Sequence, residues 1–220
     1  MPKKSKIKAI PIHNGYLYPL VNKCLTFLKY LNLVEGFKYI GQKLTPKNCS
    51  DEIKIKYSRI SVDLFIITKW LFIILLWIFK VKNEWLVSIV WYLLAMNLYT
   101  YFYYHTWASE ILNDVNLDVD RIKRRFLNLM LSIFYSIFGF AYLYSNPYSP
   151  NFNWSEGKPT VVQSLWFSIS NSLTANFDQV KPITNLGYSI SMIQLLMMFM
   201  FLTVIIGGTI PQLGSIRKDG

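Results

Sequence analysis

The fold of this chain is decided by residues 164–179, which read SLWFSISNSLTANFDQ. This stretch lies between two long apolar segments, and it is too short and too polar to cross a bilayer. Its pattern is that of a short helix that enters the membrane and then gives way to an irregular loop. Irregular backbone is tolerated at membrane depth only where protein buries it or where it lines a water-filled path. The stretch therefore makes ion conduction the first functional hypothesis.

The composition is that of a membrane protein. Of the 220 residues, 53% are hydrophobic and only 16% are charged, against roughly 25% in soluble domains. The net charge of +11 alone would suit a nucleic-acid partner. However, Lys and Arg gather in segments expected to face the cytoplasm, so we attribute the charge to membrane topology and expect no nucleic acid.

Four apolar runs approach or exceed the roughly 20 residues that cross a hydrocarbon core of ~30 Å. They cover residues 64–79, 85–104, 127–145 and 186–210. Only residues 80–84 join the first two runs, which predicts a tight antiparallel hairpin. The predicted fold class is an all-α membrane protein: four transmembrane helices with a re-entrant pore helix and loop between the third and fourth.

The positions of Lys and Arg predict the orientation. Lys69 lies inside a span, and the other 22 divide into 18 on one side of the membrane and 4 on the other. By the positive-inside rule, both termini are expected in the cytoplasm of a multi-pass cell-membrane protein, and the loop at 174–178 enters from outside.

These spans divide the chain into five predicted parts. They are a cytoplasmic basic N-terminal region with an amphipathic helix (1–60), a transmembrane hairpin (61–104), a cytoplasmic linker (105–126), a pore module (127–210) and a cytoplasmic tail (211–220). The amphipathic helix is predicted to lie on the inner leaflet or to pack under the spans, with Gly41 as its end. Its apolar stripe consists of Leu20, Cys24, Phe27, Leu28, Leu31 and Val34.

The module at 127–210 resembles the potassium-channel superfamily of tetrameric pore-loop channels. Members have a pore helix, then T-V-G-Y-G-D, then P-x-T-x-x-G and the inner helix. The chain matches in three ungapped pieces: Leu165, Ser168 and Ile169 in the pore helix; Thr174, Ala175, Asn176, Phe177, Asp178 and Gln179 at the filter; and Pro182, Thr184 and Gly187 after it. The resemblance implies a homotetramer that passes monovalent cations, with Thr174, Ala175, Asn176, Phe177 and Asp178 as its selectivity filter.

Both filter glycines of the family are replaced here, by Asn176 and Asp178. In the family, the filter exposes backbone carbonyls that replace the hydration shell of the ion, and its glycines take positive φ. Asn and Asp are the other residues that tolerate this conformation best, so a filter-like backbone is expected to survive. Four Asp178 carboxylates would then ring the outer mouth and select by charge, which predicts a poorly selective cation pore.

The last span is expected to carry the gate. By family spacing, Phe199, Leu202, Ile206 and Ile210 face the axis, where large apolar rings close a pore by dewetting. Ordinary packing of the bundle is the alternative for these four residues. Gly207 and Gly208 would either flex the inner mouth or allow close helix packing.

Other features carry weaker hypotheses. Lys69 is a functional candidate because it lies within a span, but snorkelling of its amine to the interface is the preferred interpretation. The acidic run at 114–120 lacks the Gly and Glu of a calcium loop, and the tyrosine-rich run at 99–107 is typical of an interfacial belt. We find no catalytic constellation and expect neither an enzyme nor a cofactor or metal. The alternative function is a non-conducting, channel-like sensor or scaffold, of the kind found in bacterial stress or phage defence, that recruits a cytoplasmic protein. A transporter subunit is a weaker one, because no inverted repeat is evident.

Overall fold

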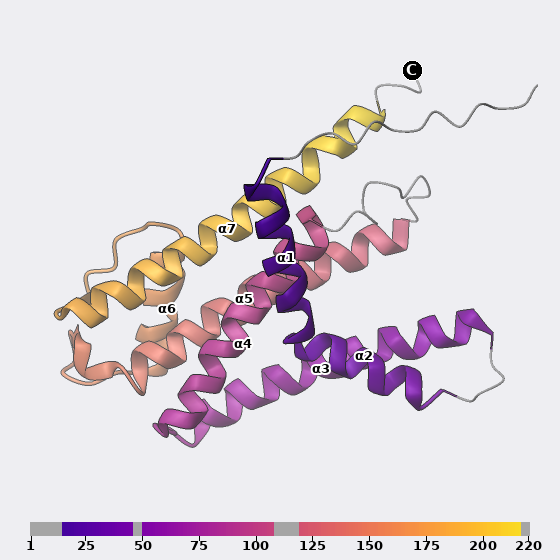
Figure 1. Cartoon of the computed structure of the whole chain (residues 1–220). Helices are drawn as coiled ribbons and strands as arrows, with labels where there is room; N and C mark the ends of the chain where they lie inside the picture. The colour runs from indigo at the N-terminus through magenta and orange to yellow at the C-terminus, as the bar shows by residue number, and fades with distance from the viewer. Residues whose placement is uncertain (1–14, 46–49, 108–118, 217–220) are drawn as a thin grey trace, which may run out of the picture.

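The computed structural model describes residues 15–45, 50–107 and 119–216, and helices dominate it (Figure 1). The helices are α1 (Leu17–Tyr30), α2 (Leu33–Lys43), α3 (Asp51–Ile78), α4 (Glu84–Phe102), α5 (Val119–Ser145), α6 (Val161–Ser172) and α7 (Asn185–Ile216). A π-helical turn, η1 (Tyr103–Trp107), extends α4, and a 3-10 turn, η3 (Ser149–Asn151), follows α5. Two short strands, β1 (Phe152–Trp154) and β2 (Val180–Pro182), pair antiparallel on either side of α6.

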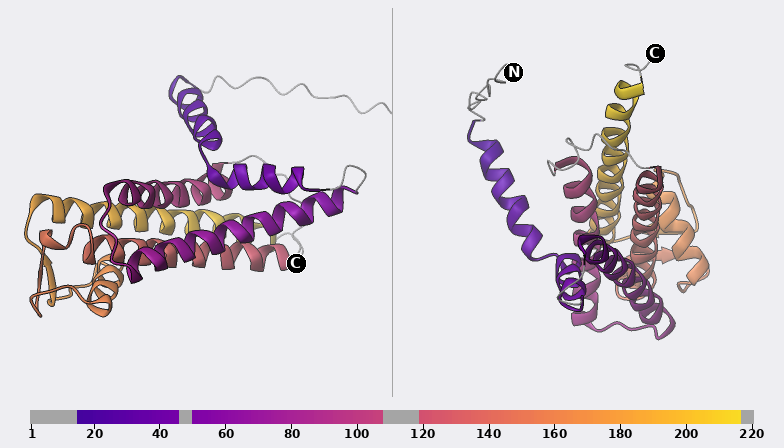
Figure 2. Two further views of the ribbon diagram at one scale, coloured as in Figure 1. Left: turned by 90° about the horizontal axis from the view of Figure 1, so that it is seen from below. Right: turned by 90° about the vertical axis from the view of Figure 1, so that its right-hand side faces the viewer.

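Four of these helices are long and apolar enough to cross a membrane, and they run side by side (Figures 1 and 2). The apolar segments are Ile53–Ile78, Glu84–Phe102, Phe126–Ser145 and Asn185–Val204. The prediction of a mainly α-helical, multi-pass membrane protein with four spans is therefore confirmed. The first membrane-spanning helix, α3, begins at Asp51, well before the predicted start of the span at residue 64. It extends this far because residues 51–63 contain neither Gly nor Pro to interrupt it.

The predicted hairpin between the first two spans is also present. The chain leaves α3 at Phe79 and turns at Lys80, which has φ +48°. Asn83 then caps α4, since its side-chain oxygen accepts a hydrogen bond from the Trp85 N–H at 2.9 Å. The short turn forces α3 and α4 to lie antiparallel.

Aromatic side chains of α5 form the centre of the bundle. Tyr135, Phe140, Tyr142 and Tyr144 are fully buried. Phe138 of the same helix receives edge-to-face contacts from Trp70 and Trp77 of α3, with ring centroids 5.3 and 5.9 Å apart. Rings of this size bury large areas, so α5 is the helix around which the other spans pack.

The N-terminal region forms two helices where the sequence predicts one continuous stripe. The helical stripe breaks at Asn32, whose side-chain oxygen accepts from the Val34 N–H at 3.0 Å and so caps α2. Gly41, expected to end the helix, lies inside α2 instead and is buried. A Cβ at Gly41 would lie 2.0 Å from Ser61 Oγ, so glycine permits the close approach of α2 to α3.

The tyrosine-rich end of α4 holds the N-terminal helices in place. The Tyr99 hydroxyl donates to the Leu25 carbonyl at 2.6 Å, and Trp107 Nε1 donates to Asn22 Oδ1 at 2.9 Å. The Tyr104 hydroxyl donates to Glu35. These contacts use only one side of α1, which extends outward from the bundle (Figure 2). The hydroxyl and indole N–H groups of this aromatic run therefore bind the N-terminal helices, in addition to the interfacial role predicted from sequence.

Candidate functional site

The candidate site is built on α6, which packs against α5 and also contacts α7. Thr160 begins this helix, because its side-chain oxygen accepts from the Gln163 N–H at 3.2 Å. Small polar residues then allow a close approach to α5. Ser168 is fully buried, and its hydroxyl donates to the Ile137 carbonyl at 2.7 Å. The end of α6 is therefore held at a fixed depth against the third span.

A buried amide of α7 fastens the other side of α6. Gln194 has no exposed surface, and its Nε2 donates to the Ser168 carbonyl, the Ser168 hydroxyl and the Ser172 hydroxyl at 2.7–2.9 Å. Its Oε1 accepts from the Tyr144 hydroxyl at 2.6 Å and from Asn171 Nδ2 at 2.9 Å. One side chain thus joins α5, α6 and α7. Gln194 was not among the predicted site residues, although a polar amide within an apolar span is a signal for such a role.

The predicted filter residues lie in the loop that follows α6. Thr174, Ala175, Asn176 and Asp178 are exposed, and Phe177 packs partly against the bundle core. Asp178 does not stand alone: its carboxylate lies 3.2 Å from Lys181 Nζ, and it also accepts from Asn176 Nδ2 at 3.2 Å. In a single chain, the charge expected to form an acidic ring is therefore partly offset by a lysine.

The backbone of this loop differs from the expected filter conformation. Thr174 has φ +56°, whereas Asn176 and Asp178 do not adopt positive φ. The side-chain bond between Asn176 and Asp178 accounts for part of this loop shape, since Asx side chains bridge two residues in turns. The two residues that replace the family's glycines thus do not reproduce their left-handed backbone.

The P-x-T-x-x-G piece has a structural explanation within the chain. Thr184 begins α7, because its hydroxyl oxygen accepts from the Gly187 N–H at 3.1 Å and donates to Asn151 Oδ1 at 2.7 Å. A Cβ at Gly187 would lie 2.5 Å from the Asn151 carbonyl oxygen, so only glycine fits this contact. Pro182 ends β2, opposite Phe152. The contacts of Pro182, Thr184 and Gly187 therefore attach the end of the loop and the start of α7 to the segment after α5.

Two of the four predicted gate residues can be placed. Phe199 and Leu202 are 63% and 51% exposed, and both line a hollow of about 860 Å³ between α5, the end of α6 and α7. Leu173 and Thr174 line the same hollow, so the start of the loop and this face of α7 border one space. Ile206 and Ile210 belong to α7, but their side chains lie outside the described part, as does the acidic run at 114–120.

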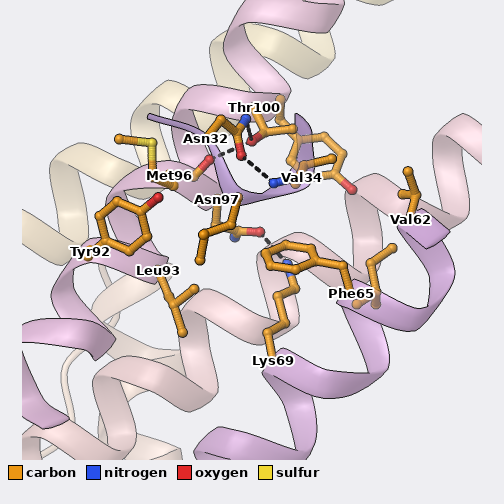
Figure 3. A pocket seen from close by; sticks show the side chains of 13 residues that line it. Asn32, Val34, Val62, Phe65, Lys69, Tyr92, Leu93, Met96, Asn97 and Thr100 are labelled. Atoms are coloured by element: carbon orange, nitrogen blue, oxygen red, sulfur yellow. Dashed lines mark hydrogen bonds between the residues drawn. The ribbon is translucent and has the colours of Figure 1, made fainter. Parts of the chain in front are cut away.

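A second polar site lies around Lys69, between α3, α4 and the start of α2 (Figure 3). Lys69 does not snorkel as expected: it is only 7% exposed, and its Nζ donates to Asn97 Oδ1 at 2.6 Å. Asn97 Nδ2 in turn donates to the Ser132 carbonyl and the Ser136 hydroxyl of α5 at 3.0 and 3.1 Å. The amine stays inside because Asn97 offers an acceptor that lipid cannot.

No protein-family model, no curated protein and no solved structure matches this chain.

Proposed function

We propose that the chain forms a poorly selective cation channel, as a homotetramer of the potassium-channel type in the cell membrane, with both termini cytoplasmic. The observation that carries the proposal is the shared hollow beside α7. The start of the polar loop at Thr174 and the apolar residues Phe199 and Leu202 border it, and both are exposed in the single chain. A single chain contributes one such loop, so a pore on an axis requires several copies arranged in a ring.

The rigid attachment of α6 supports the same proposal. A filter needs its residues held in place, and the bonds from Gln194 to Ser168 and Ser172 fix the end of α6 immediately before the loop. The β1–β2 pair holds the other end of the loop, with Asn153 opposite Lys181. The start of residues 174–178 is thus anchored to two spans through α6, and their end is anchored through β2 to the segment after α5.

Asp178 is the proposed source of cation attraction. Around a fourfold axis, four such carboxylates would add their fields and raise the local concentration of cations. The lysine at 3.2 Å weakens this effect, but the pair is exposed, so water screens it. This arrangement favours selection by charge over selection by size, and it agrees with the absence of left-handed backbone at Asn176 and Asp178.

The second candidate function is a non-conducting, channel-like sensor or scaffold. Its support is that same backbone, because a loop without filter geometry is also expected of a pore fold that no longer conducts. The α1 helix supplies a surface for a cytoplasmic partner, since none of its residues is buried.

Planar-bilayer recording of the purified protein tests the proposal, with potassium on one side and sodium on the other. We expect single-channel currents with a permeability ratio near one and strong preference for cations over anions. Asp178→Asn should lower cation conductance most at low ionic strength, because 0.1 M salt screens charges beyond about 10 Å. Glu156→Gln is the matched control, as Glu156 is also exposed on the segment between α5 and α7 but lies outside the loop. A tetrameric protein that gives no current would favour the non-conducting scaffold.

A further inference from the structure

Lys69 is a buried amine, and no carboxylate lies among the described residues around it. Its amine has two described neighbours, the Asn97 side-chain oxygen at 2.6 Å and the Tyr135 ring, whose centroid is 4.5 Å away. Both are neutral. Burial of an ammonium group costs several kcal/mol unless an opposite charge compensates it, and the cost is highest within a membrane span.

The acidic residues of the neighbouring elements have other partners. Asp63, on the same helix, is exposed and pairs with Arg124 at 2.7 Å. Glu35, on α2, pairs with Lys38 at 2.7 Å. Among the described residues that border the space beside Lys69, none carries a carboxylate. The described residues around the cavity therefore supply no negative charge to a protonated Lys69.

A small cavity adjoins the amine. Its volume is about 50 Å³, its walls are mostly apolar, and Asn32 and Val34 of the N-terminal region cover it (Figure 3). A cavity needs roughly 10–15 Å³ to hold one water-sized sphere, so this one has room for a small ion. The head group and chain of a lipid are too large for it. Polar edges are supplied by Asn97 and Thr100.

Two further buried polar groups lie near Lys69. Trp70 Nε1 and the Tyr135 hydroxyl have no hydrogen-bond partner among the described residues. Their rings contact each other edge to face, with centroids 5.7 Å apart, and Trp70 follows Lys69 directly in the chain. Neither residue lines the cavity, so the proposed ion does not need to serve these two groups.

We propose that the cavity beside Lys69 binds a small monovalent anion, of the size of chloride, as the counter-ion of the buried ammonium group. The anion sits between the spans and the cover formed by Asn32 and Val34, and it adds to the attachment of the N-terminal region to α3 and α4. This site is independent of the proposed pore, because it lies between α2, α3 and α4 and shares no residue with the hollow beside α7.

Binding of radiolabelled chloride to the purified full chain, measured by scintillation proximity at constant ionic strength, tests this proposal. Gluconate, which is too large for the cavity, replaces the unlabelled chloride. We expect saturable binding, and a loss of affinity of roughly tenfold or more in Lys69→Met, because a bond to a charged group is worth about 1.5–3 kcal/mol. Lys82→Met is the matched control, since Lys82 is exposed in the turn between α3 and α4 and the variant should bind as the wild type does.

Thermal unfolding of the wild type tests the same proposal without the Lys69→Met variant, which could fold poorly. In the wild type, thermal unfolding followed by tryptophan fluorescence should shift to higher temperature as chloride replaces gluconate, since a ligand of the native state stabilises it. Lys69→Arg retains the charge and should retain the shift. Absence of saturable binding and of any shift in the folded wild type would overturn the proposal and leave a neutral amine with water in the cavity.

Discussion

At the scale of single residues, two buried polar side chains organise the molecule. Gln194 joins three helices through five hydrogen bonds, and Asn97 joins α4 to both α3 and α5. The hydrocarbon core of a bilayer holds no water that could form hydrogen bonds with such groups, so their hydrogen-bond partners must be in the protein. Each of these two residues therefore fixes the rotation of its helix as well as its contact with a neighbour.

Replacement of Gln194 tests this role. Gln194→Leu keeps the size of the side chain but removes the acceptor of the buried Tyr144 hydroxyl. It also removes one hydrogen bond each from Asn171 and Ser172, which keep their bonds to the Ser191 and Ser168 carbonyls. We expect a loss of about 1–3 kcal/mol in the free energy of unfolding, the typical cost of buried groups left unsatisfied. Unfolding by sodium dodecyl sulfate titration in mixed micelles measures it.

Gln179→Leu is the control for this experiment, because Gln179 is exposed in the loop before β2. The same change there should leave stability within about 0.5 kcal/mol of the wild type. Equal effects of the two substitutions would mean that Gln194 does not hold α6 in place.

At the scale of helices, the spans were predictable and their polar contacts were not. Runs of apolar residues and the short turn at 79–83 suffice to predict four spans and a hairpin, since length and hydropathy depend on the sequence alone. The break at Asn32 was missed because the apolar stripe continues across it. Its cause is a cap together with a contact to Thr100 of α4, and neither can be read from helical periodicity.

The same limit applies to the candidate site. A short helix followed by a loop between the last two spans was predictable from the sequence, and α6 is such a helix. Gly187 of the P-x-T-x-x-G piece has a structural reason of its own, the close contact with the Asn151 carbonyl. The conformation of residues 174–178 could not be predicted from glycine replacement alone. It includes a bond from Asn176 to Asp178 and an ion pair between Asp178 and Lys181, and side-chain contacts of this kind cannot be read from the replacement of glycines.

The attachment of α2 to the spans should depend on pH. Burial raises the pKa of Glu35, but hydrogen bonds from Lys38 and Tyr104 and the charges of Lys38 and Lys29 outweigh it, so the pKa lies below its usual 4.5. A lowered pKa means that the pairing contributes stability above pH 4.5 and loses it as the pH falls through the folded-state value. Burial and the Glu35 carboxylate both raise the pKa of Tyr104, so this donor stays protonated over the same range.

A dye on Cys24 reports this attachment, in a chain where Cys49→Ser leaves one thiol. Cys24 is exposed on α1, so the dye does not disturb the bundle. We expect high fluorescence anisotropy at neutral pH and a fall below pH 4.5. In Glu35→Gln the anisotropy at neutral pH should be lower than in the wild type and should not depend on pH, while the bonds from Tyr99 to Leu25 and from Trp107 to Asn22 still hold α1. The exposed Glu156, changed to Gln, serves as the control and should follow the wild type. An anisotropy that Glu35→Gln leaves unchanged would contradict the role of the Glu35 pairing.

At the scale of the whole molecule, one face of α7 is left without a partner. Phe199 and Leu202 are more than half exposed beside the hollow, although they stand next to the well-buried Met198 and Phe201. Lipid can cover such a face, and so can further copies of the chain. The two arrangements differ in the number of chains per particle, so native mass spectrometry from detergent should give a tetramer if the channel proposal holds. A monomer or dimer as the only species would refute it.

The same face should control closure of the pore. In a tetramer, four copies of Leu202 would form an apolar ring that excludes water and blocks ions without atomic contact. Leu202→Asn makes the ring polar and favours the wet state, so we expect a higher open probability in planar bilayers and slower growth of expressing cells. Ile193→Asn is the control, because nine residues at 3.6 per turn put Ile193 on the opposite side of α7, where it is exposed but does not border the hollow. If both variants form tetramers and neither raises the current, Leu202 is a packing residue and the gate lies elsewhere on α7.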